Sequence, residues 1–179
     1  MSGVMTEKDA AMLFPVELGA VAVAATGVAL VVEHLTSGLA VVVYDGVGVV
    51  GVAYSLRGRA EPGDRSVEMR PALFVDHALP ELLRMMAERG AREECVAAIV
   101  GGAAGVGWRR SRDMSLDAAA TARGWLAKAG IAVRFEAVGG TQSRTLQVDG
   151  SGRLQLDTAR EPRRVVSLAV TAAAAGGRP

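Results

Sequence analysis

Hydrophobic residues in the first third of the chain fall into short runs that are rich in valine. Four such runs cover residues 16–23, 28–32, 39–44 and 47–56. Thr26-Gly27 separates the first two runs, and Asp45-Gly46, a strong hairpin signal, separates the last two. The pattern therefore predicts strands over these ranges, and the last two runs predict a hairpin that is buried on both faces.

The spacing of hydrophobic residues changes after a polar segment. Residues 57–71 contain two prolines and two glycines and predict an exposed loop. Beyond it, apolar residues recur at helical spacing, at positions 73, 78, 79, 82, 83, 86 and 87. Gly90 follows as a natural C-cap. We expect an amphipathic helix that closes at Gly90.

The rest of the chain alternates between strand and helix patterns. Residues 95–100 predict a short strand that ends at Gly101-Gly102. We expect a second helix with Ser115 as its N-cap and Gly130 at its end, because Ala-rich turns lie between them. Further strands are expected at residues 131–138 and 144–148, around Gly139-Gly140 and before a hairpin near Asp149-Gly150. This order of elements predicts an α+β layered domain.

Size and charge limit what the protein can be. The 179 residues suffice for one domain, and a formal net charge of +1 gives no field that would attract nucleic acid or an anionic membrane. The longest uncharged stretch, residues 18–32, is shorter than the roughly 20 apolar residues of a membrane span. The single cysteine, Cys95, is typical of a reducing compartment. We therefore expect a cytoplasmic protein without membrane insertion, whose partner is a protein or a small molecule.

A glycine-rich segment offers a candidate nucleotide site. Gly102, Gly105 and Gly107 follow a predicted strand, as in loops that bind phosphate groups. Such a loop opens directly into a helix, whereas Trp108 and several arginines precede the helix expected here. We therefore favour a turn and expect no cofactor. The run at residues 108–112 is too short to indicate nucleic-acid binding, although it could contact an acidic partner.

Isolated reactive side chains give little sign of catalysis. Cys95 follows Glu93 and Glu94, whose charges would raise the pKa of its thiol, so a buried structural thiol is favoured over a nucleophile. His34 and His77 are the only histidines, and neither has a second clustered ligand. We therefore expect no metal site.

Five segments have the order and spacing of one known family. They are GLAVVVYD (38–45), VGVA (50–53), LFVDHALPELLRMMAERGA (73–91), AIVGGA (98–103) and AVGGTQSRTLQVDGSGRL (137–154). LFVDHALPEL resembles a KYADTAIPAL-like motif of the CheD family of chemoreceptor glutamine deamidases, and the two diglycines resemble its KIFGGA and DVGGNxxRTV patterns. The resemblance implies an α/β/β layered sandwich. It also implies, for active members, a Cys-His-Thr triad that converts receptor glutamines to glutamate with release of ammonia.

Alignment of the family motifs backwards from Tyr44-Asp45 places the triad on residues that lack its chemistry. The nucleophilic cysteine falls on Gly38, the histidine on Tyr54 and the threonine on Val32. Glycine has no side chain for attack, valine has no hydroxyl, and tyrosine is a poor base because its pKa is about 10. The family stretch NIGxRN falls on DMSLDA at residues 113–118, so the substrate groove is expected to differ as well.

We therefore expect a catalytically inactive, CheD-like protein of chemosensory signalling. It would bind a chemoreceptor helix, a CheC-like phosphatase or another signalling protein through the former active-site cleft. The residues expected at that cleft are Ser37, Gly38, Tyr54, Gly101, Gly102, Gly139, Gly140, Thr141 and Arg144. An alternative is an active glutamine deamidase that uses displaced residues such as Ser37 or Cys95. The expected boundaries are an N-terminal extension at 1–15, a CheD-like domain at 16–158 and a partly disordered C-terminal tail at 159–179.

Overall fold

Two β-sheets and one layer of helices make up the computed structural model, which describes residues 12–104 and 109–169, apart from the side chain of Ser111. Sheet A contains, in spatial order, β1 (Met12–Pro15), β3 (Val28–Leu35), β8 (Arg144–Asp149), β9 (Arg153–Thr158) and β10 (Arg164–Ser167). Sheet B contains β2 (Ala20–Ala24), β5 (Val50–Ser55), β4 (Leu39–Tyr44), β6 (Val96–Gly101) and β7 (Ala132–Val138). The helices are α1 (Ser66–Met69), the 3-10 turn η2 (Pro71–Leu73), α2 (Val75–Glu88) and α3 (Arg109–Lys128).

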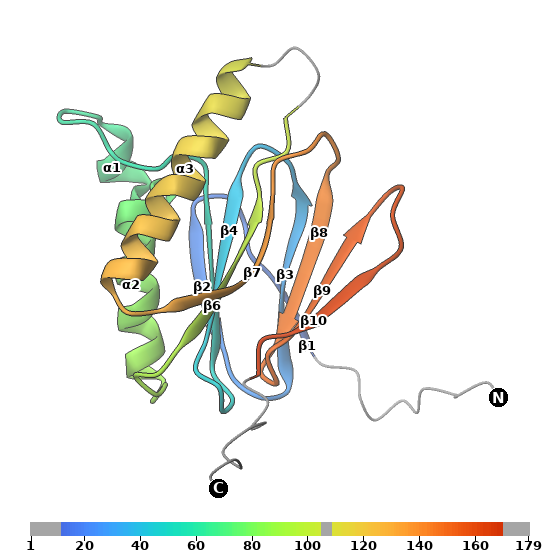
Figure 1. The fold of residues 1–179 in the computed structure, drawn as a ribbon. Coiled ribbons are helices and arrows are strands. Elements are labelled where there is room, and N and C mark those ends of the chain that lie inside the picture. Colours follow the sequence, from blue (N-terminus) through green and yellow to red (C-terminus); the bar gives the residue numbers. More distant parts are fainter. Residues whose placement is uncertain (1–11, 105–108, 170–179) are drawn as a thin grey trace, which may run out of the picture.

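Sheet B is the middle layer, because it is covered on both faces. Figure 1 shows α2 and α3 against one face of sheet B and sheet A on its other side. Alternate residues of each central strand therefore enter different cores. On β4, Val42 belongs to the core shared with sheet A, and Val41 belongs to the core shared with the helices. Every residue of β4, β5 and β6 is buried. The predicted α/β/β layering and the doubly buried hairpin are confirmed.

The ends of the two long helices follow the sequence signals. In α2 the buried face consists of Val75, Ala78, Leu79, Leu82 and Met86, at the predicted helical spacing. Gly90 has φ of 77°, and the amide of Ala91 donates to the carbonyl of Met86 over 3.0 Å. Gly130, with φ of 72°, closes α3 in the same way, since the amide of Ile131 donates to Leu126 over 2.9 Å. Both predicted C-caps are confirmed.

Two local predictions are wrong. Helix α3 begins at Arg109 rather than at Ser115, and Ser115 is buried on its inner face. The hydroxyl of Ser115 makes a tertiary hydrogen bond to another segment, which takes the place of the N-cap bond that we expected. Residues 57–71 are not entirely a loop, because they include α1 and the first residue of η2. Residues 105–108, with Gly105, Gly107 and Trp108, lie outside the described part of the chain.

Sheet A includes residues on both sides of the expected domain boundaries. Strand β1 comes from the segment expected to be an N-terminal extension, and it pairs in parallel with β3. Strand β10 comes from the expected C-terminal tail and pairs with β9, and Leu168 beyond it is buried. The boundaries at 16 and 158 therefore cut through sheet A. Residues 170–179, the tip of that tail, lie outside the described residues.

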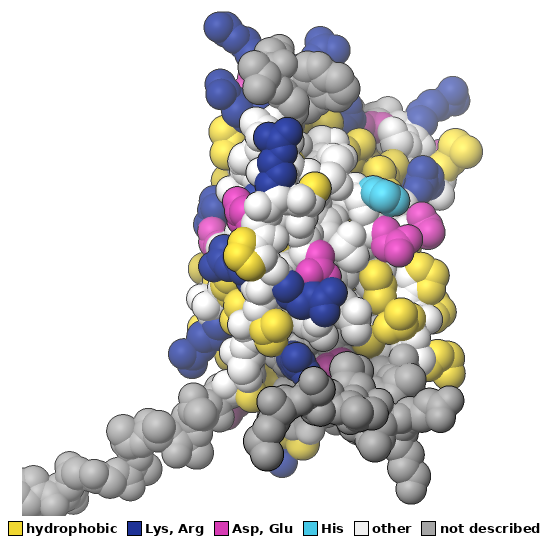
Figure 2. All heavy atoms as spheres, turned by 90° about the vertical axis from the view of Figure 1, so that its right-hand side faces the viewer, with side chains coloured by type: hydrophobic (Ala, Val, Ile, Leu, Met, Phe, Trp, Pro, Cys, Tyr) yellow, Lys and Arg dark blue, Asp and Glu magenta, His cyan; other side chains and the backbone are white. Residues whose placement is uncertain are grey.

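The outer face of sheet A is not covered by α2 or α3 (Figure 1). Its central strands direct half-buried polar side chains outwards, such as Gln147 on β8 and Gln155 on β9, which are paired in the sheet. Figure 2 shows this side of the molecule, where charged side chains of both signs are scattered rather than gathered into one patch. Within the described ranges, no helix is long and apolar enough to cross a membrane.

Candidate functional site

Three loops at one end of the sheets bring together residues that are far apart in the sequence (Figure 1). They are the β3–β4 connection, the segment after β6 and the β7–β8 connection. The amide of Gly102 donates to Gly38 over 2.8 Å, and the amide of Gly139 donates to Gly101 over 2.9 Å. The amide of Ala104 donates to Gly140 over 2.9 Å. The two diglycine motifs therefore meet each other and the β3–β4 connection through backbone hydrogen bonds.

Gly101 allows this close approach. Its φ is 129°, in a region that residues with a side chain rarely adopt. A Cβ atom on Gly101 would lie 2.3 Å from the carbonyl oxygen of Gly38, and a backbone oxygen cannot move aside as a flexible side chain can. The last residue of β6 must therefore be glycine for the two loops to pack as they do.

Arg144 connects the two sheets at this end. It is the first residue of β8 in sheet A, and its guanidinium donates to two carbonyls of sheet B and its loop, Gly101 over 3.3 Å and Gly139 over 2.7 Å. Burial of the guanidinium lowers the pKa of Arg144, the carboxylate of Glu161 opposes this shift, and the charge of Arg164 adds to it. The role of Arg144 in the fold is thus to fix the position of both diglycine loops.

Tyr54 packs directly on Gly38. A Cβ atom built on Gly38 would lie 2.4 Å from Cε2 and 3.2 Å from Cζ of the tyrosine ring. The ring is almost fully buried, and Tyr54 is paired with Ala20 on β2 and with Ala40 on β4, whose small side chains leave room for it. The space next to Gly38, into which a side chain at that position would extend, is therefore filled by an aromatic ring.

Burial of Tyr54 raises the pKa of its phenol, and the charge of Glu17 raises it further. The phenol therefore stays protonated at neutral pH and does not act as a general base. Val32 is fully buried in the core between the sheets, where it offers only methyl groups. These side chains can support packing and binding, but they do not supply the proton transfers that amide hydrolysis needs.

The other predicted cleft residues lie around this pair. Ser37 is half-buried, and its carbonyl accepts a hydrogen bond of 2.8 Å from the hydroxyl of Ser115 on α3. Thr141 is exposed next to Gly140, so it lies at the rim rather than inside. Sequence reasoning did not identify Ser115 as a contact of this site. The sequence feature that points to Ser115 is the family stretch at residues 113–118, which predicts a groove but not a contact between Ser115 and Ser37.

A cavity of about 300 Å³ lies on the α3 side of the site. It is lined by Asp113, Met114 and Asp117 from α3 and by Arg57, Arg59 and Glu61 from the loop after β5. The loop approaches the helix closely at Gly58, where a Cβ atom would lie 2.4 Å from the carboxylate of Asp117. The residues of the former groove motif thus face a polar cavity with charges of both signs.

The displaced nucleophile candidate Cys95 lies away from this end. It immediately precedes β6, whereas Gly101 ends that strand. Its thiol donates to the carbonyl of Arg92 over 3.2 Å, and burial followed by the charge of Asp45 raises its pKa. His34 has φ of 52° at an irregularity of β3, and His77 lies in α2 against Phe74. Among the described residues, no group of three or more His, Cys, Asp or Glu could hold a metal ion.

Comparison with known proteins identifies relatives of the chain. The family model for CheD chemotactic sensory transduction matches residues 59–158, more than half of the sequence. A curated protein of Solibacter usitatus (strain Ellin6076), named a probable chemoreceptor glutamine deamidase CheD, is 40% identical over 88 residues. These residues are 48% of this chain and 52% of that protein, so the chain spans about half the length of the curated relative. The family-model match begins after β5 and does not include Val32, Gly38 or Tyr54.

Proposed function

Because the chain belongs to the CheD family, we propose that it is a catalytically inactive member that acts in chemosensory signalling by binding a protein partner. The observation that supports this proposal best is the contact between Gly38 and Tyr54. At the position that the family motifs assign to the nucleophile there is no side chain, and the ring of Tyr54 fills the adjoining space. The same ring stands at the position assigned to the base.

Deamidation of glutamine requires a nucleophile that attacks the carboxamide carbon and a group that transfers protons to and from the reacting atoms. Gly38 provides no nucleophile, and the phenol of Tyr54, whose pKa is raised by burial, provides no base at neutral pH. Val32 provides no hydroxyl to orient either group. On this alignment the three positions lack the groups that the chemistry needs, whereas the backbone hydrogen bonds that join the diglycine loops are present.

The surface proposed for the partner is the end of the sheets where the diglycine loops meet. Gly140 and Thr141 are exposed there, and the polar cavity beside Asp113 and Asp117 adjoins it. Family members act on glutamines of receptors, so a chemoreceptor helix is the first partner to test, followed by a CheC-like protein and other signalling proteins. The backbone hydrogen bonds among these loops would hold the shape of this surface without a catalytic requirement.

Mass spectrometry of receptor glutamines tests the inactivity. A chemoreceptor cytoplasmic fragment is incubated with the protein, and glutamine-containing peptides are examined for conversion of the amide to a carboxylate, with an active glutamine deamidase as the positive control. We expect no conversion above that in buffer alone. Conversion that depends on this protein would refute the proposal.

Binding is tested separately with the same receptor fragment by biolayer interferometry. Thr141→Arg places a large charged side chain on the proposed surface, and Ala127→Arg, at an exposed position near the other end of α3, makes the matched addition elsewhere. We expect Thr141→Arg alone to weaken binding. Equal effects of the two substitutions would show that the partner binds through another surface.

An active deamidase with displaced residues is the alternative that the name of the curated relative favours. It would need Ser37 or Cys95 as the nucleophile. An electrophilic probe distinguishes this alternative, because an activated nucleophile forms a stoichiometric adduct whose formation parallels any deamidation. We expect none at either residue, since burial raises the pKa of the Cys95 thiol and no base is assigned to Ser37.

A further inference from the structure

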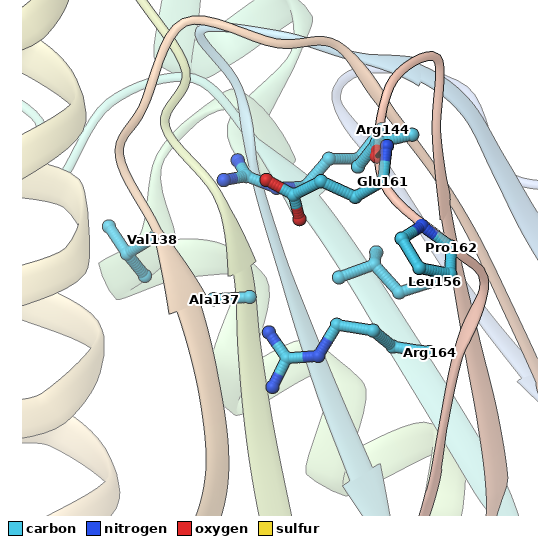
Figure 3. A pocket seen from close by; sticks show the side chains of 8 residues that line it. Ala137, Val138, Arg144, Leu156, Glu161, Pro162 and Arg164 are labelled. Carbon is cyan, nitrogen blue, oxygen red and sulfur yellow. Dashed lines mark hydrogen bonds between the residues drawn. The ribbon is translucent and has the colours of Figure 1, made fainter.

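A second cavity, of about 210 Å³, opens between the two sheets below the diglycine loops. Its apolar walls are Ala137 and Val138 of β7 and Leu156 of β9. Three charged side chains, Arg144, Glu161 and Arg164, extend from the side of sheet A towards β7, as Figure 3 shows. The cavity thus combines an apolar floor with two guanidinium groups and one carboxylate.

Both arginines are held in place by contacts that leave donors free. Arg144 uses one N–H of each terminal nitrogen on the carbonyls of Gly101 and Gly139, and a guanidinium has five N–H donors in all. Arg164 places its guanidinium carbon 5.3 Å from the centre of the Phe135 ring. The two hydrogen bonds of Arg144 orient its remaining N–H groups, and those of the exposed Arg164 are open to a ligand; the planar guanidinium suits bidentate recognition of carboxylates.

Neither arginine has an ion pair within the described residues, although other arginines do. Arg163, next to Arg164, pairs with Asp157 at 2.7 Å, and Arg123 pairs with Glu136 at 2.9 Å. Glu161 is near enough to act on Arg144 electrostatically, but it forms no ion pair with a described residue. Burial of Arg144 makes its charge costly without a counter-ion, so an anion in the cavity would offset that cost.

The charges define the ligand. Two guanidinium groups and one carboxylate are complemented by two carboxylates and one ammonium group. A simple dicarboxylate would face repulsion from Glu161, whereas an ammonium group would pair with it. The volume is below the roughly 300–1,000 Å³ typical of sites for drug-sized ligands, which restricts the ligand to a small molecule.

We propose that this cavity binds a free acidic α-amino acid, with its carboxylates on Arg144 and Arg164 and its ammonium group on Glu161. The site shares Arg144 with the loop network at the surface proposed for the protein partner, but its other charged groups, Glu161 and Arg164, come from the segment after β9 and from β10, and ligand binding does not depend on the presence or loss of deamidase activity. A negative result in the receptor assay is therefore no test of this cavity, and a failure to bind an amino acid is no test of the proposed function.

Isothermal titration calorimetry with L-glutamate and L-aspartate tests the proposal, with glutarate as the analogue of glutamate that lacks the ammonium group. We expect at least one of the amino acids to bind, and glutarate to bind more weakly than glutamate. Arg164→Gln should weaken binding by about tenfold to a hundredfold, because a charged hydrogen-bond donor is lost. Arg163→Gln is the matched control, since Arg163 pairs with Asp157, and it should leave binding unchanged.

Glu161→Gln provides a second readout that does not depend on overall affinity. It removes the carboxylate that selects for an ammonium group, so the preference for glutamate over glutarate should disappear or reverse. Circular dichroism and thermal melting confirm that each variant is folded before titration. Absence of binding of both amino acids at millimolar concentration, tighter binding of glutarate than of glutamate to the unaltered protein, or equal losses in Arg164→Gln and Arg163→Gln would each overturn the proposal.

Discussion

The contact between Gly38 and Tyr54 predicts that the two positions are energetically coupled. The perturbation is Gly38→Ala, which adds the one carbon that the tyrosine ring excludes. Gly38 does not have a positive φ, so its backbone conformation accepts alanine, and any destabilisation by the substitution comes from packing. Tyr54→Leu is the second substitution of the cycle, because leucine lacks the ring atoms Cε2 and Cζ that the new carbon would meet.

The distance between the new Cβ atom and the Tyr54 ring determines how much Gly38→Ala should destabilise the protein. At 2.4 Å, the distance from the new Cβ to Cε2 is well below ordinary van der Waals contact, so the ring must move. The ring is almost fully buried in the core between the sheets, and overpacking of such a core costs about 1–3 kcal/mol. Replacement of glycine by alanine at a compatible position gains about 0.4–1 kcal/mol through the unfolded chain. Gly38→Ala should therefore lower the free energy of unfolding by about 1–2 kcal/mol.

In the Tyr54→Leu background the same substitution should cost much less, because the ring contacts are gone and only the backbone oxygen of Ser55, 3.2 Å from the new Cβ, remains close. The four proteins of the cycle are unfolded with urea, and the free energy of unfolding is compared at neutral pH. Gly124→Ala serves as the control in both backgrounds, because Gly124 is exposed on α3 and a Cβ atom there meets nothing within 4 Å. That control should stabilise both proteins equally.

Additivity of Gly38→Ala and Tyr54→Leu within about 0.5 kcal/mol would refute this reasoning, since uncoupled sites add to that precision. An unchanged stability of Gly38→Ala alone would refute it as well. Either result would mean that the ring moves aside at no cost and that the space next to Gly38 is effectively open. The structural support for an inactive site would then be lost.

Two further predictions concern stability. Burial of Asp45 opposes its ionisation, but hydrogen bonds from backbone amides, including those of residues 47–49 at 2.9 Å each, outweigh burial and lower its pKa. Asp45→Asn should therefore lower the free energy of unfolding by about 1–2 kcal/mol at neutral pH. A lowered pKa stabilises the fold above the pKa of the unfolded chain, and this contribution is lost as pH falls through the folded value. The urea midpoints of the two proteins should therefore converge in acid, and a constant difference would contradict this. Gly101→Ala should lower the free energy of unfolding by more than about 3 kcal/mol, because backbone strain at φ of 129° is combined with a clash with the Gly38 carbonyl. A thermal midpoint close to that of Gly124→Ala would contradict this prediction.

The layers of the fold could be predicted because each element has its own local signal. Valine runs with an Asp-Gly turn specify the hairpin of β4 and β5, and helical spacing followed by Gly90 specifies α2. Strand β1 has no such signal, because Met12–Pro15 is short and exposed and is held by parallel pairing with a distant part of sheet A. The start of α3 was missed for a related reason, since the role of Ser115 depends on a tertiary partner.

The family motifs indicate which residues meet at this end of the sheets, but they do not indicate how those residues pack. The positions of Gly38 and Tyr54 follow from the family pattern, whereas their contact depends on the pairing of Tyr54 with Ala20 and Ala40. The cavity with Arg164 was also beyond sequence reasoning. It requires β10 to lie beside β9, and that strand belongs to a segment expected to be a tail.

Under the proposed function, replacement of the nucleophile at position 38 and of the base at position 54 is one packing change rather than two independent events. A cysteine at position 38 would place its Cβ atom where the ring of Tyr54 stands, so it requires a smaller side chain at position 54. Conversely, a histidine at position 54 beside Gly38 would leave part of the space of the tyrosine ring empty, at the cost of a cavity in the core. Each single step back towards an active site therefore lowers stability, and only a combined change restores both packing and chemistry. Under the proposed function, this coupling is how the ring of Tyr54 would hold the site in an inactive form.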